Sequence, residues 1–167
     1  MGGIWNCARE LGRNDLVYLG YMESFINLQH DRTGETAKML VCHPGGGSSY
    51  ADSYVIQKII ESYEGGEKPG VAFYGHYHKM LSGEYRNVWW TQVGCGKDQD
   101  PFARKKRLRY VVGGILASFK QHESGYIPRF RAEMLRYFSR GFHQNLWSHS
   151  GPVNKPPMNT VGHFWEK

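Results

Sequence analysis

The sequence has little cysteine and no closely spaced cysteine pair. Its three cysteines, Cys7, Cys42 and Cys95, are odd in number and lie far apart. This spacing excludes a disulfide framework and a closed thiolate zinc site. No apolar run approaches the roughly 18 to 20 residues of a membrane-spanning helix, and the first residues lack the basic and apolar segments of a secretory signal. We therefore expect a protein of the reducing cytosol, without a membrane partner.

Acidic residues are also scarce relative to basic ones. Lysine and arginine number 21 against 15 acids, which gives a formal net charge of +6. This surplus favours anionic partners such as nucleic acid, nucleotides or phosphorylated substrates. Part of it falls in a basic run at residues 104–109, for which a solvated helix face is the alternative interpretation. The 167 residues fit one domain, and 40% hydrophobic residues exclude wholesale disorder.

Two apolar segments and one amphipathic segment follow one another in the middle of the chain. Residues 38–43 and 70–75 have the continuous apolar character of strands buried on both faces. Between them, residues 50–63 carry apolar side chains at helical spacing, with Ser48 or Ser49 as the expected cap. The order strand, glycine-rich turn, helix, strand predicts a βαβ unit, in which function gathers at the carboxyl ends of the strands.

The remaining segments complete an α/β prediction. We expect helices at 4–12 and 101–108, and strands at 16–19, 24–28, 87–94, 110–119 and 126–137. From residue 139 the chain is rich in His, Asn, Pro and Gly without a period, which predicts an extended or disordered tail over 139–167 after a domain at 1–138.

Three histidines stand where these strands are expected to end. His43 and His76 each follow an apolar segment and adjoin a proline or a glycine, and His78 comes two residues after His76. Neutral imidazole is the commonest protein ligand of metal ions. A single histidine at a loop edge is more often satisfied by backbone hydrogen bonds, but three at neighbouring strand ends favour a shared site. A catalytic pair of divalent ions also requires carboxylates.

The histidine segments, in this βαβ order, resemble the C-terminal half of the calcineurin-like metallophosphoesterases, most closely their uncharacterised viral and prokaryotic members. That family ends on an isolated histidine after one strand and a Gly-His-x-His motif after the next. His43, followed by Pro44 and the glycines Gly45, Gly46 and Gly47, matches the first motif. The second motif is matched by Gly75, His76 and His78.

The resemblance implies part of a two-sheet β-sandwich with flanking helices, and a hydrolase acting on a phosphomonoester or phosphodiester. It also implies two divalent ions of the Mn, Fe, Zn or Ni type. In such enzymes the residues that match His43 and His76 bind one ion, and the residue that matches His78 binds the other. On the substrate side, Asp98 and Arg104 are further candidates, because they follow in a polar loop and the basic run.

The family's earlier motifs, Asp-x-His, Gly-Asp and Gly-Asn-His, do not occur in the sequence. They supply the bridging carboxylate, so the resemblance implies an incomplete site. We therefore expect a complementary N-terminal-half polypeptide or a homo-oligomer as partner. Two alternatives stay open: a noncatalytic structural or interaction protein that kept the scaffold, and a nucleic-acid-binding module that uses the basic run and the aromatic strands.

Overall fold

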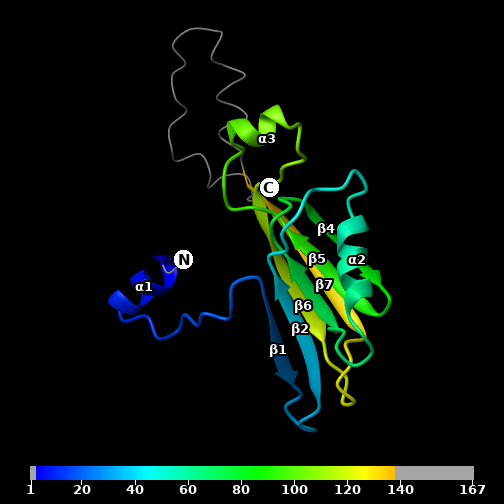
Figure 1. Ribbon diagram of the computed structural model, residues 1–167. Coiled ribbons are helices and arrows are strands. Elements are labelled where there is room, and N and C mark those ends of the chain that lie inside the picture. Colours follow the sequence, from blue (N-terminus) through cyan, green and yellow to red (C-terminus); the bar gives the residue numbers. More distant parts are fainter. Residues whose placement is uncertain (1–2, 138–167) are drawn as a thin grey trace, which may run out of the picture.

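The structure, a computed structural model, describes residues 3–137 (Figure 1). In chain order its elements are α1 (Gly3–Glu10), β1 (Glu23–Gln29), β2 (Thr36–Cys42), α2 (Tyr54–Ser62), β3 (Val71–Tyr74), β4 (Met80–Tyr85), β5 (Val88–Val93), α3 (Pro101–Lys105), β6 (Gly113–Lys120) and β7 (Arg129–Arg136). The predicted α/β class is confirmed. The tail predicted over 139–167 lies outside the described residues. None of the described helices has the length and apolar character needed to cross a membrane.

The main sheet has the strand order β1-β2-β3-β5-β4. Its three central strands β2, β3 and β5 are parallel, and β1 and β4 pair antiparallel at the two edges. The strands β2 and β3 are joined through α2, so the predicted βαβ unit is confirmed. Because parallel strands end at the same edge of a sheet, the loops after β2, β3 and β5 emerge together; we call this edge the carboxyl edge.

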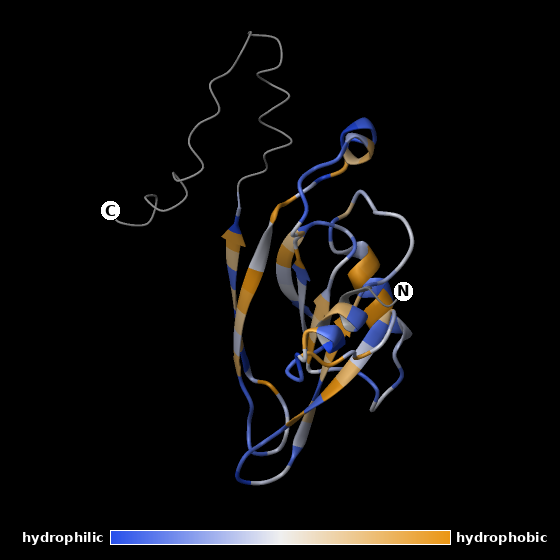
Figure 2. Ribbon diagram, turned by 90° about the vertical axis from the view of Figure 1, so that its left-hand side faces the viewer, coloured by the Kyte–Doolittle hydropathy of each residue, from blue (hydrophilic) through white to orange (hydrophobic). Residues whose placement is uncertain are grey.

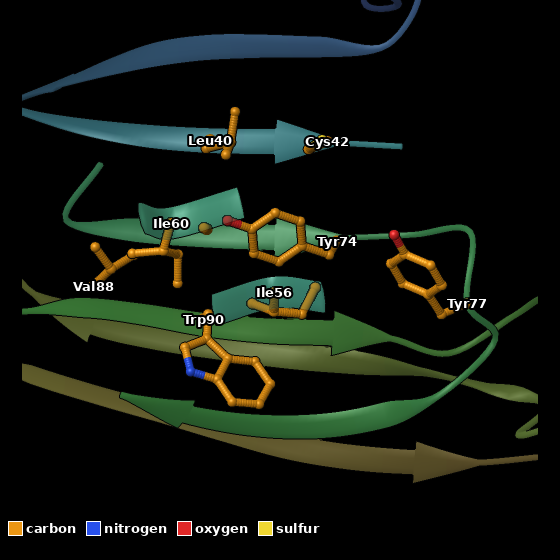
Figure 3. Close-up of a cluster of buried hydrophobic side chains, with 9 residues drawn as sticks. Leu40, Cys42, Ile56, Ile60, Tyr74, Tyr77, Val88 and Trp90 are labelled. Carbon is orange, nitrogen blue, oxygen red and sulfur yellow. The ribbon is translucent and has the colours of Figure 1, made fainter. Parts of the chain in front are cut away.

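One face of the main sheet is covered by α2. Its apolar residues Ile56 and Ile60 are one helical turn apart and fully buried. They pack against Leu40 of β2, Tyr74 of β3 and Trp90 of β5 (Figure 3). Burying an isoleucine side chain contributes about 1.5 to 3 kcal/mol, so this helix holds the loop that precedes it firmly over the carboxyl edge.

The other face is covered by the β6–β7 hairpin, which Figure 2 shows as a separate layer beside the main sheet. The ring of Phe130 in β7 stacks on Trp89, with centroids 5.9 Å apart, and lies 6.3 Å from the ring of Phe73. The indole nitrogen of Trp89 donates to the carbonyl of Ile127 at 2.9 Å. These contacts make two facing sheets with a second apolar core between them.

Three details differ from the sequence-based expectations. Residues 16–19 form no strand, because they find no neighbouring strand among the described residues and their side chains stay exposed. The helix expected from residue 50 begins at Tyr54, and its N-cap is Ser53, whose side chain makes no capping bond, instead of Ser48 or Ser49. In β2, Val41 is 41% exposed, because the hairpin layer does not reach the carboxyl end of this strand.

Candidate functional site

Two loops meet at the carboxyl edge, one after β2 and one after β3. The amide of Gly75 donates to the carbonyl of Cys42 at 2.9 Å, which extends the pairing of the two strands by one step. The rings of His43 and His76 are thereby brought edge to face, with centroids 5.1 Å apart and an interplanar angle of 78°. The expectation that these two histidines share one edge of the sheet is confirmed.

The backbone of His76 is strained. Its φ is 72°, and the amide of Tyr77 donates to the carbonyl of Gly75 at 2.9 Å across it. This is the pattern of the γ-turn with positive φ at its central residue, a rare turn that costs free energy. Nε2 of His76 lies 3.0 Å from the carbonyl oxygen of Gly46. With Nε2–H as the donor, Nδ1 keeps its lone pair for another ligand.

Two glycines make this approach possible. A Cβ placed on Gly75 would lie 3.1 Å from Nδ1 of His43, tighter than an ordinary contact, so glycine lets the His43 ring rest against the turn. Gly46 has a φ of 89°, which side chains other than glycine rarely adopt, and this conformation accompanies its carbonyl contact with His76. The other glycines of this loop differ: a Cβ on Gly45 or Gly47 would meet open space.

His78 stands beside this pair in a different environment. Its φ is 52°, and its ring packs edge to face on Tyr110 with centroids 4.7 Å apart. Burial lowers the pKa of His78, and the positive charge of Lys97 lowers it further. Positive charge on His76 and His43 lowers the pKa of His78 as well, whereas the carboxylate of Asp100 raises it. His78 is therefore held toward its neutral form, the form that can bind a metal ion.

A buried lysine ties the two loops together. Lys79 is 6% exposed, and its Nζ forms an ion pair with Asp52 at 2.9 Å and donates to the carbonyl of Ser49 at 3.1 Å. Asp52 also pairs with Arg109. Nearby, the hydroxyl of Tyr77 donates to the carbonyl of Gly45 at 3.2 Å. Sequence reasoning missed Lys79 and Tyr77. The ring of Tyr77 packs edge to face on the ring of His76, with centroids 5.1 Å apart.

The donors at the carboxyl edge do not complete a two-metal centre. Within residues 3–137, no three side chains of the His, Cys, Asp or Glu type are placed to hold a metal ion. The carboxylate of Asp52 is held by two cations, and that of Asp100 binds Lys97 at 2.5 Å and the amide of Ala103 at 2.8 Å. The chain thus offers one imidazole pair with His78 beside it. That His43, His76 and His78 are metal ligands stays a prediction.

The two substrate-side candidates lie on the chain that follows β5. The carbonyl of Asp98 accepts a hydrogen bond from the hydroxyl of Tyr110 at 3.1 Å. The ring of Tyr110 also packs against the ring of His78. Arg104 lies on α3, which starts at Pro101 and is capped by Asp100. The basic run expected to form one helix over 101–108 is helical only over Pro101–Lys105, and the rest of it is loop.

An apolar hollow of about 320 Å³ opens beside His43. It lies on the same face of the main sheet as the hairpin, since Phe73 lines it and also packs in the core beneath the hairpin. It is lined chiefly by residues of the segment before β1 and of the central strands, among them Leu19, Met22, Val41, Phe73 and Val93. By contrast, Leu40, Val71 and Ala72 are buried within this chain. The partner expected from the sequence was expected to bind along the central strands, but most of their apolar side chains are buried within the chain, and Val41 beside the hollow is the exposed exception in β2.

No protein-family model matches the chain, and no curated protein is similar enough to count as a match. Among solved structures, the chain is similar to a single-mutant form of Vps29 from Entamoeba histolytica. The similarity covers 76% of this chain and 67% of that one, at 12% sequence identity and a TM-score of 0.37. The resemblance to metallophosphoesterases therefore depends on the histidine and glycine motifs themselves.

Proposed function

We propose that this chain carries the histidine part of a metal-dependent phosphoesterase site, to which polypeptide outside residues 1–167 supplies the carboxylates. The observation that carries the proposal is the pairing of His43 and His76 at the ends of two adjacent parallel strands, 5.1 Å between ring centroids. The strained turn at His76 supports it, because such strain persists at sites where function requires it.

In this proposal His43 and His76 bind one divalent ion, and His78 faces a second. The contact of His76 Nε2 with the carbonyl of Gly46 orients the imidazole ring. It leaves the lone pair of Nδ1 to bind the metal ion. Asp52 and Asp100 are excluded as ligands, since lysine and arginine side chains already hold them. Two imidazoles without a carboxylate favour zinc or nickel over manganese, so the chain alone should bind metal weakly and hydrolyse no phosphoester.

Isothermal titration of the tag-free chain with zinc tests this proposal. We expect one saturable site that is lost in His43→Ala and in His76→Ala. The matched control is His122→Ala, at the far end of the hairpin, which should bind zinc as the unaltered chain does. Zinc binding that survives both substitutions at the carboxyl edge would contradict the proposal. Manganese-dependent hydrolysis of a chromogenic phosphodiester by the chain alone would contradict the requirement for outside carboxylates.

A second candidate function is a noncatalytic interaction module on the same scaffold. The observation in its favour is the apolar hollow beside His43, with Leu19, Met22 and Val41 all more than 40% exposed. Exposed apolar patches of this kind mark protein contacts. Sedimentation separates the two functions: self-association that Val41→Asp abolishes, together with an absence of zinc binding, would favour the interaction module.

A further inference from the structure

The outer face of the β6–β7 hairpin carries a row of cations, far from the carboxyl edge. Lys120 pairs directly across from Arg129, and Ser118 across from Arg131. We call Lys120, Arg129 and Arg131 the hairpin basic patch. All three are exposed, and none takes part in an ion pair among the described residues. Like charges opposite each other on one sheet face repel, which an anion bound between them would relieve.

An exposed aromatic pair continues this surface at the hairpin turn. The rings of His122 and Tyr126 lie 4.9 Å apart, tilted by 36°, and Tyr126 is 56% exposed. Their neighbours Gln121 and Ile127 face the main sheet, where Gln121 Nε2 donates to the carbonyl of Leu28 and Ile127 is buried. His122 and Tyr126 themselves are exposed, in the loop that joins Lys120 at the end of β6 to Arg129 at the start of β7.

A hollow of about 490 Å³ lies next to the ring pair, between the hairpin turn and the turn after β1. The two turns are joined by a hydrogen bond from Thr33 Oγ1 to the carbonyl of Glu123 at 2.9 Å. Arg32 and Lys120 line the hollow, as do the acids Asp31 and Glu123. The hollow itself therefore carries charges of both signs, and the surplus of cations lies beside it on β7, where Arg129 and Arg131 are exposed and Glu133 follows.

We infer that the outer face of the hairpin binds single-stranded nucleic acid. The hairpin basic patch contacts backbone phosphates, and Tyr126 offers a stacking surface for an unpaired base. Cations that follow a chain of phosphates, together with an exposed ring, are the combination by which proteins hold single strands. A duplex hides its base faces, and an acidic peptide has no bases to stack, so the ring favours a single strand over both. The net charge of +6 adds long-range attraction.

This surface is independent of the proposed metal site, which lies at the opposite end of the strands. Fluorescence anisotropy of a labelled single-stranded oligonucleotide of mixed sequence measures the affinity of the chain for nucleic acid. In the double variant Arg129→Ser/Arg131→Ser, we expect weaker binding and a slope of log K against log salt that is shallower by about 1.4, or about 0.7 for each lost phosphate contact. Tyr126→Ala should weaken binding about five- to hundredfold through lost stacking.

The matched control is Arg104→Ser/Arg107→Ser, which removes the same charge from the basic run around α3. It should leave the salt slope unchanged. An equal loss in both double variants would overturn the inference, because it would show a response to net charge alone. So would equal affinity for a duplex of the same sequence or for polyglutamate. The variant His43→Ala/His76→Ala should bind the oligonucleotide normally, which separates this inference from the metal proposal.

A measurement on the unaltered chain guards against a variant that fails to fold. Ultraviolet cross-linking to the same oligonucleotide, followed by peptide mass spectrometry, should place the cross-link on the peptide that contains Tyr126. Cross-links confined to residues 101–110 would overturn the inference.

Discussion

The rings of His43 and His76 meet edge to face at 5.1 Å, although they belong to different strands and different loops. Their meeting follows from the parallel pairing of β2 with β3, in which Cys42 lies opposite Tyr74 and both strands end at the same level. A shift of β3 by one residue against β2 would turn the side chains of β3 to the other face and move His76 away from His43. The pairing of these two strands therefore builds the candidate site.

The glycine beneath the His43 ring should be required for the site. In Gly75→Ala, the added Cβ would lie 3.1 Å from His43 Nδ1 and push the ring away from His76. We expect about tenfold weaker zinc binding by isothermal titration, the loss typical of a displaced ligand. Gly47→Ala is the matched control, because its Cβ meets open space and its φ is not positive. Equal affinity in the two variants would contradict the proposed ligand geometry.

The ion pair between Asp52 and Lys79 should hold the two loops in place. Asp52→Asn leaves the buried ammonium of Lys79 without its countercharge, and we expect the free energy of unfolding to fall by about 1 to 3 kcal/mol. Chemical denaturation measures the change. Asp15→Asn, which breaks an exposed pair with Arg13, is the control and should change nothing measurable. A loss no larger than that of the control would contradict the role of Lys79.

The same pair has a predictable pH dependence. The hydrogen bond from Lys79 lowers the pKa of Asp52 below its ordinary value, with Arg109 adding to the effect. A carboxylate whose pKa is lowered by folding stabilises the protein above the unfolded value of about 3.9, and this contribution is lost as the pH falls through the folded value. The stability difference between the unaltered chain and Asp52→Asn should therefore be constant from pH 5 to 7 and shrink below about pH 4.

Removal of one buried hydroxyl should stabilise the protein. The hydroxyl of Tyr74 is fully buried and has no hydrogen-bond partner among the described residues. Tyr74→Phe removes this unsatisfied group, and we expect the free energy of unfolding to rise by about 1 kcal/mol. Tyr85→Phe is the control. It should lower the free energy of unfolding, because the hydroxyl of Tyr85 donates a hydrogen bond to Glu61 at 2.6 Å. A loss of stability in Tyr74→Phe would reveal a partner for this hydroxyl.

The cysteines should differ in reactivity. Burial, together with the charge of Glu23, raises the pKa of the Cys42 thiol to about 11, whereas Cys7 is exposed. Since the thiolate is the nucleophile, iodoacetamide at pH 8 should modify Cys7 and spare Cys42. Mass spectrometry of tryptic peptides measures both sites. Modification of Cys42 at the rate of Cys7 would show that β2 opens readily to solvent.

The sequence was sufficient to predict the βαβ unit, because its apolar runs and glycine stops are strong local signals. It was not sufficient to predict β4. The turn between β4 and β5 places Arg86 and Asn87 at φ values of 51° and 64°, without the glycine that usually marks such a hairpin. A glycine such as Gly83 also argues against a strand in the sequence. In the structure, a Cβ at this position would lie 2.8 Å from the Trp90 ring, so glycine is needed to accommodate this core side chain.

The candidate site was predicted in position but not in detail. Histidines that follow buried parallel strands are brought to one edge by topology alone. The side-chain partners of the neighbouring carboxylates depend on tertiary contacts that no local pattern encodes. Asp52 and Arg109, for example, form an ion pair although one precedes α2 and the other follows α3. The exposure of Val41 likewise depends on how far the hairpin layer extends over β2.

Nuclear magnetic resonance of the histidine side chains during a zinc titration tests the central claim most directly. The ring nitrogens of His43 and His76 should shift together and saturate at one equivalent of zinc, while His30 and His122 stay unchanged. This result would place the metal between the two rings at the carboxyl edge. Shifts at His30 or His122 first, or no common saturation of His43 and His76, would contradict the account.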